Sequence, residues 1–302
     1  MAGVRNIIEV ENLKKEYKVT DIFKRLKGEK KKVGVENISF NVKEGEVFSI
    51  IGLNGAGKTT IMKLLLGLIK PDSGMVRVFS KEKLSREDYY KIGYLPEISY
   101  YPKEVKLRDL MNYYSELYGM DEVYKDKIIS EIFEILNLKD REKDRLESFS
   151  KGMLQKVGLA QAILNEPKIL FLDEPMSGLD PLARRIVSDL IRKLKKKGTT
   201  IILNTHILSD VEKLSDRIAF LDQGKMKDII NFSTYQNKNE KYVVEVDTCI
   251  DKSIRMNDKY YNKVLKEDLN DFLKELNEND IKINSIEKEN ITLEKIFLEK
   301  IV

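Results

Sequence analysis

Residues 52–60 form a glycine-rich segment that ends in a lysine and two threonines. Its spacing fits G-x-x-x-x-G-K-[ST], in which small residues let backbone N–H groups surround the phosphates of a nucleotide. We expect Gly55 and Gly57 to supply the φ angles that this turn requires. Lys58 would then reach the β- and γ-phosphates, and the Thr59 hydroxyl would bind Mg²⁺. The segment therefore predicts a phosphate-binding P-loop.

The stretches on either side of this segment predict how the chain holds it. Residues 47–51 are an apolar run, and residues 61–66 continue with the spacing of a helix. A buried strand that turns into a helix is the setting that a P-loop needs, and the helix N-terminus adds a positive field. A glycine-rich turn without a ligand is the alternative, and this setting disfavours it.

A second buried strand is predicted at residues 168–172, and two carboxylates, Asp173 and Glu174, follow it. A continuous apolar run suits a strand that is buried on both faces, and its carboxyl end opens toward the crevice where such sheets bind ligands. We expect Asp173 to hold Mg²⁺ through its water shell and Glu174 to polarise the attacking water. The pattern has the form of a Walker B strand.

Two further side chains are candidates for contacts with the nucleotide. His206, the sole histidine, follows the apolar strand predicted at residues 199–205 and should reach the same sheet edge. Tyr17 ends a short alternating strand at residues 7–17, where its ring could stack on a base. Packing on an edge strand is the alternative for Tyr17.

Composition limits the class of protein. Charged residues make up 34% of the 302 residues and the net charge is only +4, so no overall basic field predicts a nucleic-acid partner. One cysteine and one histidine exclude an internal disulfide and disfavour a zinc site, which leaves an oxygen-ligated Mg²⁺. No apolar stretch approaches the ~18 residues of a membrane span, and Glu9 and Glu11 oppose a signal peptide. We expect a cytosolic chain.

The patterns along the chain predict two domains. We expect an ATPase domain at residues 1–224, with a helical subdomain inserted at about 91–160, and a C-terminal accessory domain at 225–302. The predicted fold class is α/β, a P-loop NTPase (RecA-like) core with a helical insertion and a small C-terminal α+β appendage. The basic segment at residues 21–32 is either a solvated face or a contact for acidic headgroups or an acidic partner.

A P-loop and a Walker B strand alone would fit a kinase, a GTPase or a helicase. The order of further segments is more specific: residues 150–155 precede the Walker B strand and residues 177–180 follow it. Together with Glu174 and His206, this order resembles the ATPase subunit of ABC transporters across about residues 5–224. The resemblance implies ATP as ligand and ATP hydrolysis as activity.

The resemblance also implies roles for individual residues. The phosphates would lie against Asn54, Gly55, Ala56, Gly57, Lys58, Thr59 and Thr60. Tyr17 would stack on adenine, and His206 would contact the γ-phosphate and the water. Ser150 and Gly152 would touch the γ-phosphate bound by a second subunit, and Asp180 belongs to the loop that links the two sites. Glu97 stands where many members have a glutamine that senses Mg²⁺.

Two departures from the family pattern concern the signature segment, which usually reads Leu-Ser-Gly-Gly-Gln. Lys151 adds a charge near the phosphate of the second subunit, and Met153 removes an amide. Glu97 in place of glutamine is a third change. Its carboxylate could still engage the metal, and its charge near the γ-phosphate alters the electrostatics.

The resemblance implies two kinds of partner. A second ATPase subunit, identical or different, would complete each site, and a separate transmembrane permease would carry the substrate. Residues 292–298 look like the tail of exporter-type subunits. We therefore expect a chain that is peripheral on the inner face of the cell membrane and powers export. The alternatives are a soluble ABC-type ATPase acting on ribosomes or DNA, and a regulator that uses ATP only to dimerise.

Overall fold

The computed structural model describes residues 5–18, 31–251, 253–256, 259–289 and 291–301. The described chain forms two compact units, one up to Ile229 and one from Ile230 to Lys300. Most of the basic segment at 21–32 lies outside the described residues. No described helix combines the length and the apolar character of a membrane span.

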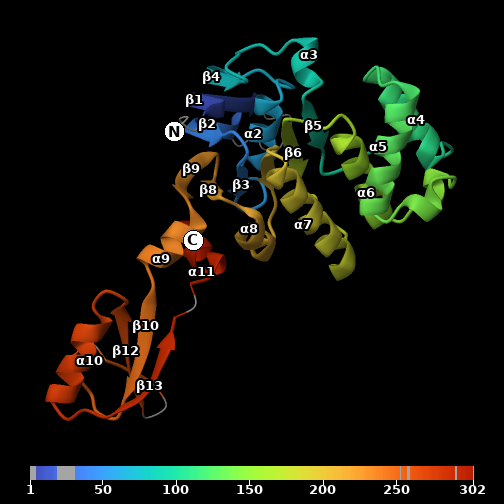
Figure 1. The fold of residues 1–302 in the computed structure, drawn as a ribbon. Coiled ribbons are helices and arrows are strands. Elements are labelled where there is room, and N and C mark those ends of the chain that lie inside the picture. The colour runs from blue at the N-terminus through green and yellow to red at the C-terminus, as the bar shows by residue number, and fades with distance from the viewer. Residues whose placement is uncertain (1–4, 19–30, 252, 257–258, 290, 302) are drawn as a thin grey trace, which may run out of the picture. The chain divides into compact units, whose positions relative to one another are not determined.

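A six-stranded sheet is the centre of the first unit (Figure 1). In spatial order its strands are β5 (Ile92–Leu95), β6 (Ile169–Asp173), β7 (Thr200–Asn204), β3 (Val47–Ile51), β8 (Arg217–Asp222) and β9 (Lys225–Ile230). The pairs β5–β6, β6–β7, β7–β3 and β3–β8 are parallel. Their carboxyl ends therefore share one edge, which is where ligands bind in sheets of this kind.

A smaller antiparallel sheet has the order β2 (Lys31–Lys43), β1 (Asn6–Lys18), β4 (Ser73–Val78). The helix after the P-loop, α2 (Lys58–Leu65), packs between the two sheets, since its buried side chains share one apolar cluster with both. The cluster includes Ile38 of β2, Ile61 and Met62 of α2, and Phe48 of β3. Burial of these side chains fixes the smaller sheet over the start of α2.

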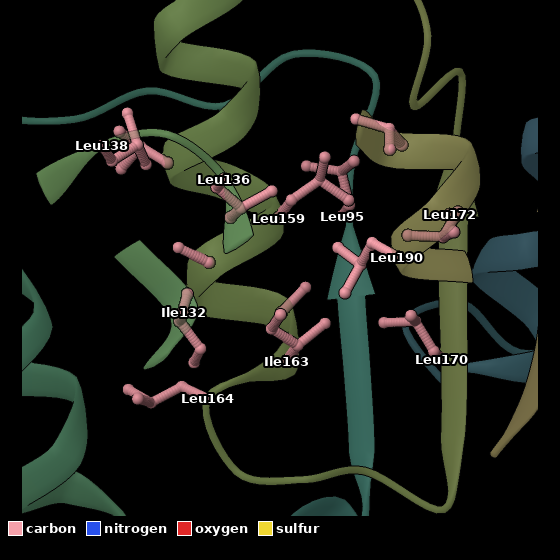
Figure 2. Packing of buried hydrophobic residues seen from close by; sticks show 14 of the residues in the cluster. Leu95, Ile132, Leu136, Leu138, Leu159, Ile163, Leu164, Leu170, Leu172 and Leu190 are labelled. Carbon is pink, nitrogen blue, oxygen red and sulfur yellow. The ribbon is translucent and has the colours of Figure 1, made fainter. Parts of the chain in front are cut away.

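The helical region lies between β5 and β6 in the sequence. Its elements are α4 (Leu107–Leu117), α5 (Glu122–Ile135), the short 3₁₀ turns η1 (Lys139–Arg141) and η2 (Leu146–Ser148), and α6 (Lys151–Ile163). In Figure 2, Leu159 and Ile163 of α6 lie between Leu95 of β5 and Ile132 of α5. One face of α6 therefore packs on the sheet and another on the helices beyond it.

Other connections of the first unit are helical as well. They are α3 (Arg86–Tyr89) before β5, α7 (Pro181–Lys196) between β6 and β7, and α8 (Leu208–Leu214) between β7 and β8. The prediction of a helical subdomain from about residue 91 needs a correction, because residues 92–95 form strand β5 of the large sheet. A strand of four residues is too short for periodicity to distinguish it from the helices that follow.

The second unit is α+β. It contains α9 (Phe232–Lys238), β10 (Lys241–Val246), β11 (Ile254–Met256), β12 (Lys259–Leu265), α10 (Leu269–Glu278), β13 (Ile283–Lys288) and α11 (Leu293–Ile301). Its antiparallel sheet has the order β11-β12-β10-β13, and α10 packs on it through the cluster around Val244, Val264 and Leu276. The unit begins later than the predicted boundary at residue 224, because β9 continues the large sheet after the turn at Gly224.

Candidate nucleotide-binding site

The P-loop connects β3 to α2 at the carboxyl edge of the large sheet. Gly55 and Gly57 have φ angles of +83° and +111°, in the left-handed region that the sequence predicted for them. A Cβ atom at Gly57 would lie only 2.2 Å from the carbonyl oxygen of Gly34. Gly57 also stands at the N-terminus of α2, so the N–H groups from Gly57 to Thr60 have no intrahelical partner. The loop thus presents backbone donors that suit an anion.

Lys58 is almost fully buried, and its side chain folds over its own loop. The Nζ atom donates hydrogen bonds to the carbonyl oxygens of Gly52 at 2.9 Å and Leu53 at 3.2 Å. Burial lowers the pKa of Lys58, while the negative charges of Glu174, Asp173 and Glu97 act in the opposite direction. The negative charges of the three predicted site carboxylates therefore all act on the ammonium group.

Asp173 ends β6 with a side chain that is 1% exposed. Asn204 Nδ2 donates a hydrogen bond to Oδ1, and the Thr59 hydroxyl lies close to the carboxylate. Burial raises the pKa of Asp173 to about 6, the charges of Glu97 and Glu174 add to this, and the Asn204 hydrogen bond and the Thr59 hydroxyl oppose it. Among the described residues Oδ2 has no hydrogen-bond partner. A buried oxygen of this kind beside a threonine hydroxyl fits the oxygen ligands that Mg²⁺ prefers.

Glu174 has an uncommon backbone conformation, with φ at +53°. Its N–H donates to the carbonyl oxygen of Asn204 at 2.8 Å, and its own carbonyl oxygen accepts from Ser177 N at 3.1 Å and Gln155 Nε2 at 3.2 Å. His206 Nδ1 lies 2.9 Å from Glu174 Oε2. A left-handed non-glycine residue that is held by its surroundings is a common feature of functional sites.

Tyr17 lies beside the start of α2. Its hydroxyl is 3.4 Å from Thr60 Oγ1, and a Cβ atom at Gly34 would lie 2.7 Å from Tyr17 Cε2. Tyr17 is 37% exposed. An aromatic ring that is partly open to solvent next to a P-loop suits base stacking.

The signature residues form a second group in the same unit. Ser150 caps the N-terminus of α6, where its Oγ accepts a hydrogen bond from Met153 N at 3.3 Å. A Cβ atom at Gly152 would lie 3.2 Å from the carbonyl oxygen of Gly178, so this helix end packs on the loop at 177–180. Asp180 caps α7 by accepting from Ala183 N at 2.8 Å. Among the described residues, no hydrogen bond joins Ser150, Gly152 or Asp180 to the P-loop.

The structure thus brings one set of predicted residues together at the sheet edge and leaves another set apart. The first set is Lys58, Thr59, Glu97, Asp173, Glu174 and His206. Sequence reasoning missed Gln155 and Asn204, which contact Glu174 and Asp173. Asn204 gave a usable signal, since a polar residue at the end of a buried strand next to β6 should face Asp173. Gln155 gave none, because its contact comes from tertiary packing.

Known proteins of similar sequence were compared with this chain. Residues 35–177 match the family described as ABC transporter. An uncharacterized ABC transporter ATP-binding protein of Nostoc sp. PCC 7120 is 35% identical over 281 residues, which cover 90% of this chain and 84% of the relative. A Synechocystis relative with the same description is 40% identical, and the match covers 73% of this chain and 62% of that protein's length. The bacitracin transport ATP-binding protein BcrA of Bacillus licheniformis is 35% identical, with 75% of this chain and 73% of BcrA covered.

A solved structure of an ATP-binding subunit of an ABC transporter superposes with a TM-score of 0.67 and 29% identity, over 76% of this chain and 92% of that one. The chain therefore belongs to the ABC transporter family, within the P-loop NTPase fold. It is an ATP-binding subunit of that family and an ATPase.

Proposed function

We propose that the chain hydrolyses ATP to drive export of a substrate through a separate transmembrane permease. The observation that carries the proposal is the contact of the Glu174 carboxylate with His206, next to Asp173 and Thr59 at the P-loop. The resemblance of residues 292–298 to the tail of exporter-type subunits supports the direction, and BcrA supports a transport role because it is named for transport of bacitracin.

The P-loop residues Asn54 to Thr60 would bind the phosphates through backbone N–H groups and the Lys58 ammonium. Asp173 and Thr59 would hold Mg²⁺, which neutralises charge that develops on the phosphates. Glu97 is near enough to raise the pKa of Asp173 and would face the same metal. Tyr17 would stack on adenine.

Glu174 would act as the general base. A carboxylate that accepts a proton from the attacking water needs a fixed position. Here hydrogen bonds fix the main chain of Glu174, and His206 Nδ1 lies beside Oε2 of its carboxylate. His206 would orient that carboxylate and contact the γ-phosphate. Phosphoryl transfer depends mainly on such positioning and on electrostatic stabilisation.

A second ATPase subunit would complete each site. Ser150, at the N-terminus of α6, lies where a helix favours an anion, and Gly152 lies in the first turn of the same helix. Asp180 would act indirectly, by fixing the start of α7 and the loop that packs on Gly152.

An apolar surface after Glu97 is the proposed contact with the permease. Ile98 is 61% exposed and Tyr100 is 89% exposed, and exposed apolar side chains that lie close together often mark a protein interface. Contact there would place the chain on the inner face of the membrane.

Copurification tests this proposal. The chain is tagged, membranes are extracted in mild detergent, and proteins at near-equal stoichiometry are identified. We expect a multi-span membrane protein to copurify with the wild-type chain. It should no longer copurify with the Tyr100→Ser variant. It should still copurify with Val123→Ser, which is the control at another exposed apolar side chain. Ribosomal or DNA-processing proteins without a membrane chain would overturn the transport role.

A further inference from the structure

Gln155 is a buried amide that joins the signature helix to the proposed general base. It lies on α6, five residues after Ser150 in the sequence, and is 5% exposed. Its Nε2 atom donates a hydrogen bond of 3.2 Å to the carbonyl oxygen of Glu174. Among the described residues, no other side chain donates a hydrogen bond to the main chain of Glu174.

The main chain of Glu174 is held from three sides. Asn204 of β7 accepts from its N–H, Ser177 of the following loop donates to its carbonyl, and Gln155 donates to the same carbonyl. A left-handed φ is unfavourable for a non-glycine residue, because it brings the Cβ atom too close to the following carbonyl oxygen. Such a conformation persists only where the surroundings determine it. The position of α6 therefore helps to determine the position of the Glu174 main chain, from which the carboxylate side chain extends.

Helix α6 carries Gln155 and is packed on two sides. Its buried residues Leu159 and Ile163 pack against β5 on one side and α5 on the other (Figure 2). At its C-terminal half, Gln161 Oε1 accepts a hydrogen bond of 2.9 Å from the Tyr101 hydroxyl, four residues after Glu97. At its N-terminus stands Ser150. Gln155 therefore lies on the same helix between Ser150 and Gln161.

We propose that Gln155 is a positioning residue through which the location of α6 sets the location of the Glu174 carboxylate. The proposal rests on the proposed function, because it assumes that Glu174 is the general base. Such coupling would make the rate of ATP hydrolysis in each subunit depend on the position of its own helix α6. This helix would lie next to the second subunit when the two subunits associate. Gln155 itself need not touch ATP.

The competing explanation is that Gln155 only satisfies a buried carbonyl and stabilises the fold. Gln155→Met distinguishes the positioning role from the purely structural role, since the methionine side chain has nearly the same length and no hydrogen-bond donor. Gln161→Met is the matched control, because it makes the same change on the same helix at a residue that contacts Tyr101 instead of Glu174. The unfolding temperature of each variant is measured beside its activity.

The decisive measurement is a double-mutant cycle with Glu174→Gln on the full chain. We expect Gln155→Met to lower kcat roughly 10- to 100-fold with little change in KM, the scale of a misplaced catalytic group. In the Glu174→Gln background the same substitution should change the residual single-turnover rate less than about 2-fold, because the group that it positions is already removed. Gln161→Met should keep kcat within a few-fold of wild type.

Three outcomes would overturn the proposal. They are an unchanged kcat in Gln155→Met, an equal loss of rate in both backgrounds, and a rise in KM without a fall in kcat. Each leaves the proposed function intact as long as Glu174→Gln alone lowers turnover by about 10²-fold or more. If Glu174→Gln alone turns over like wild type, the role of Glu174 fails and the role of Gln155 fails with it.

Discussion

His206 Nδ1 lies 2.9 Å from Glu174 Oε2, and this contact joins an imidazole that is 60% exposed to a carboxylate that is 10% exposed. The two residues come from the ends of neighbouring parallel strands, whose register pairs Asp173 of β6 with Asn204 of β7. Because the two strands are parallel and in this register, Glu174 and His206, which follow the paired residues, lie at the same edge of the sheet. The geometry of the pair is thus a consequence of strand pairing.

Glu174→Gln should keep ATP binding and lower turnover about 10²-fold or more, because the amide cannot accept the proton from water. Phosphate release measures turnover, and equilibrium binding of ATP measures affinity. Turnover within a few-fold of wild type would remove Glu174 from the role of general base.

Tyr17→Ala should weaken ATP binding roughly 5- to 150-fold, since base stacking contributes about 1–3 kcal/mol in related settings. The maximal rate at saturating ATP should change little, because the ring is remote from the reacting bond. Tyr17→Phe is the control: it keeps the ring and loses only the hydroxyl contact with Thr60. Equal affinity of the alanine variant and wild type would speak against stacking.

Glu97→Gln should tighten ATP binding by about 5-fold at low salt, which corresponds to the removal of roughly 1 kcal/mol of charge repulsion. Its carboxylate acts on both Asp173 and Lys58, so it shares their electrostatic environment. The gain should shrink at high ionic strength, where screening is strong. Titration of ATP at two salt concentrations measures this, and the exposed Glu104→Gln serves as control. A weaker affinity in Glu97→Gln would show that the contact of this carboxylate with the metal outweighs its repulsion of ATP.

Gly57→Ala should destabilise the first unit more than Gly55→Ala. Both residues have left-handed φ angles, so each change costs about 1–2 kcal/mol of backbone strain. A Cβ atom at Gly57 would also collide with Gly34, whereas nothing lies within 4 Å of one at Gly55. Denaturant midpoints of the two variants give the comparison, and equal midpoints would contradict it.

Glu240→Gln should destabilise the second unit at neutral pH. Hydrogen bonds from Lys288 and Lys266 lower the pKa of Glu240 to about 2, below its usual 4.5. Because the folded pKa is the lower one, this contribution is complete above pH 4.5 and is lost as the pH falls toward 2. The difference in unfolding midpoint between variant and wild type should therefore shrink from pH 5 to pH 3. The exposed Glu287→Gln should show no such trend, and an equal trend there would refute the assignment.

The sequence was most informative where chemistry is local. The P-loop glycines, Lys58 and the acids after β6 could be located because spacing and strand ends place them without knowledge of the fold. Asp180 shows a local signal that was passed over: aspartate before Pro181 is typical of a helix N-cap, and that is its contact here.

Contacts that depend on packing could not be predicted. Gln155 meets Glu174 only because α6 packs on the sheet, and the left-handed conformation of Glu174 follows from hydrogen bonds to two other elements. The boundary after β9 was missed for a related reason, since Gly224 has the appearance of a domain end but forms a turn between two strands of one sheet. The same local sequence pattern can occur at the end of a domain and in a turn between two strands of one sheet.

The position of β3 has a consequence for how the chain acquires its function during synthesis. Val47 pairs with Ile201 and Phe48 pairs with Arg217, so the strand before the P-loop lies between two strands made much later. Early in translation β3 lacks both neighbours, and contacts so distant in sequence form slowly. A nascent chain that ends before β8 should therefore be unable to capture ATP, and the ribosome must complete most of the first unit before the nucleotide can help it fold.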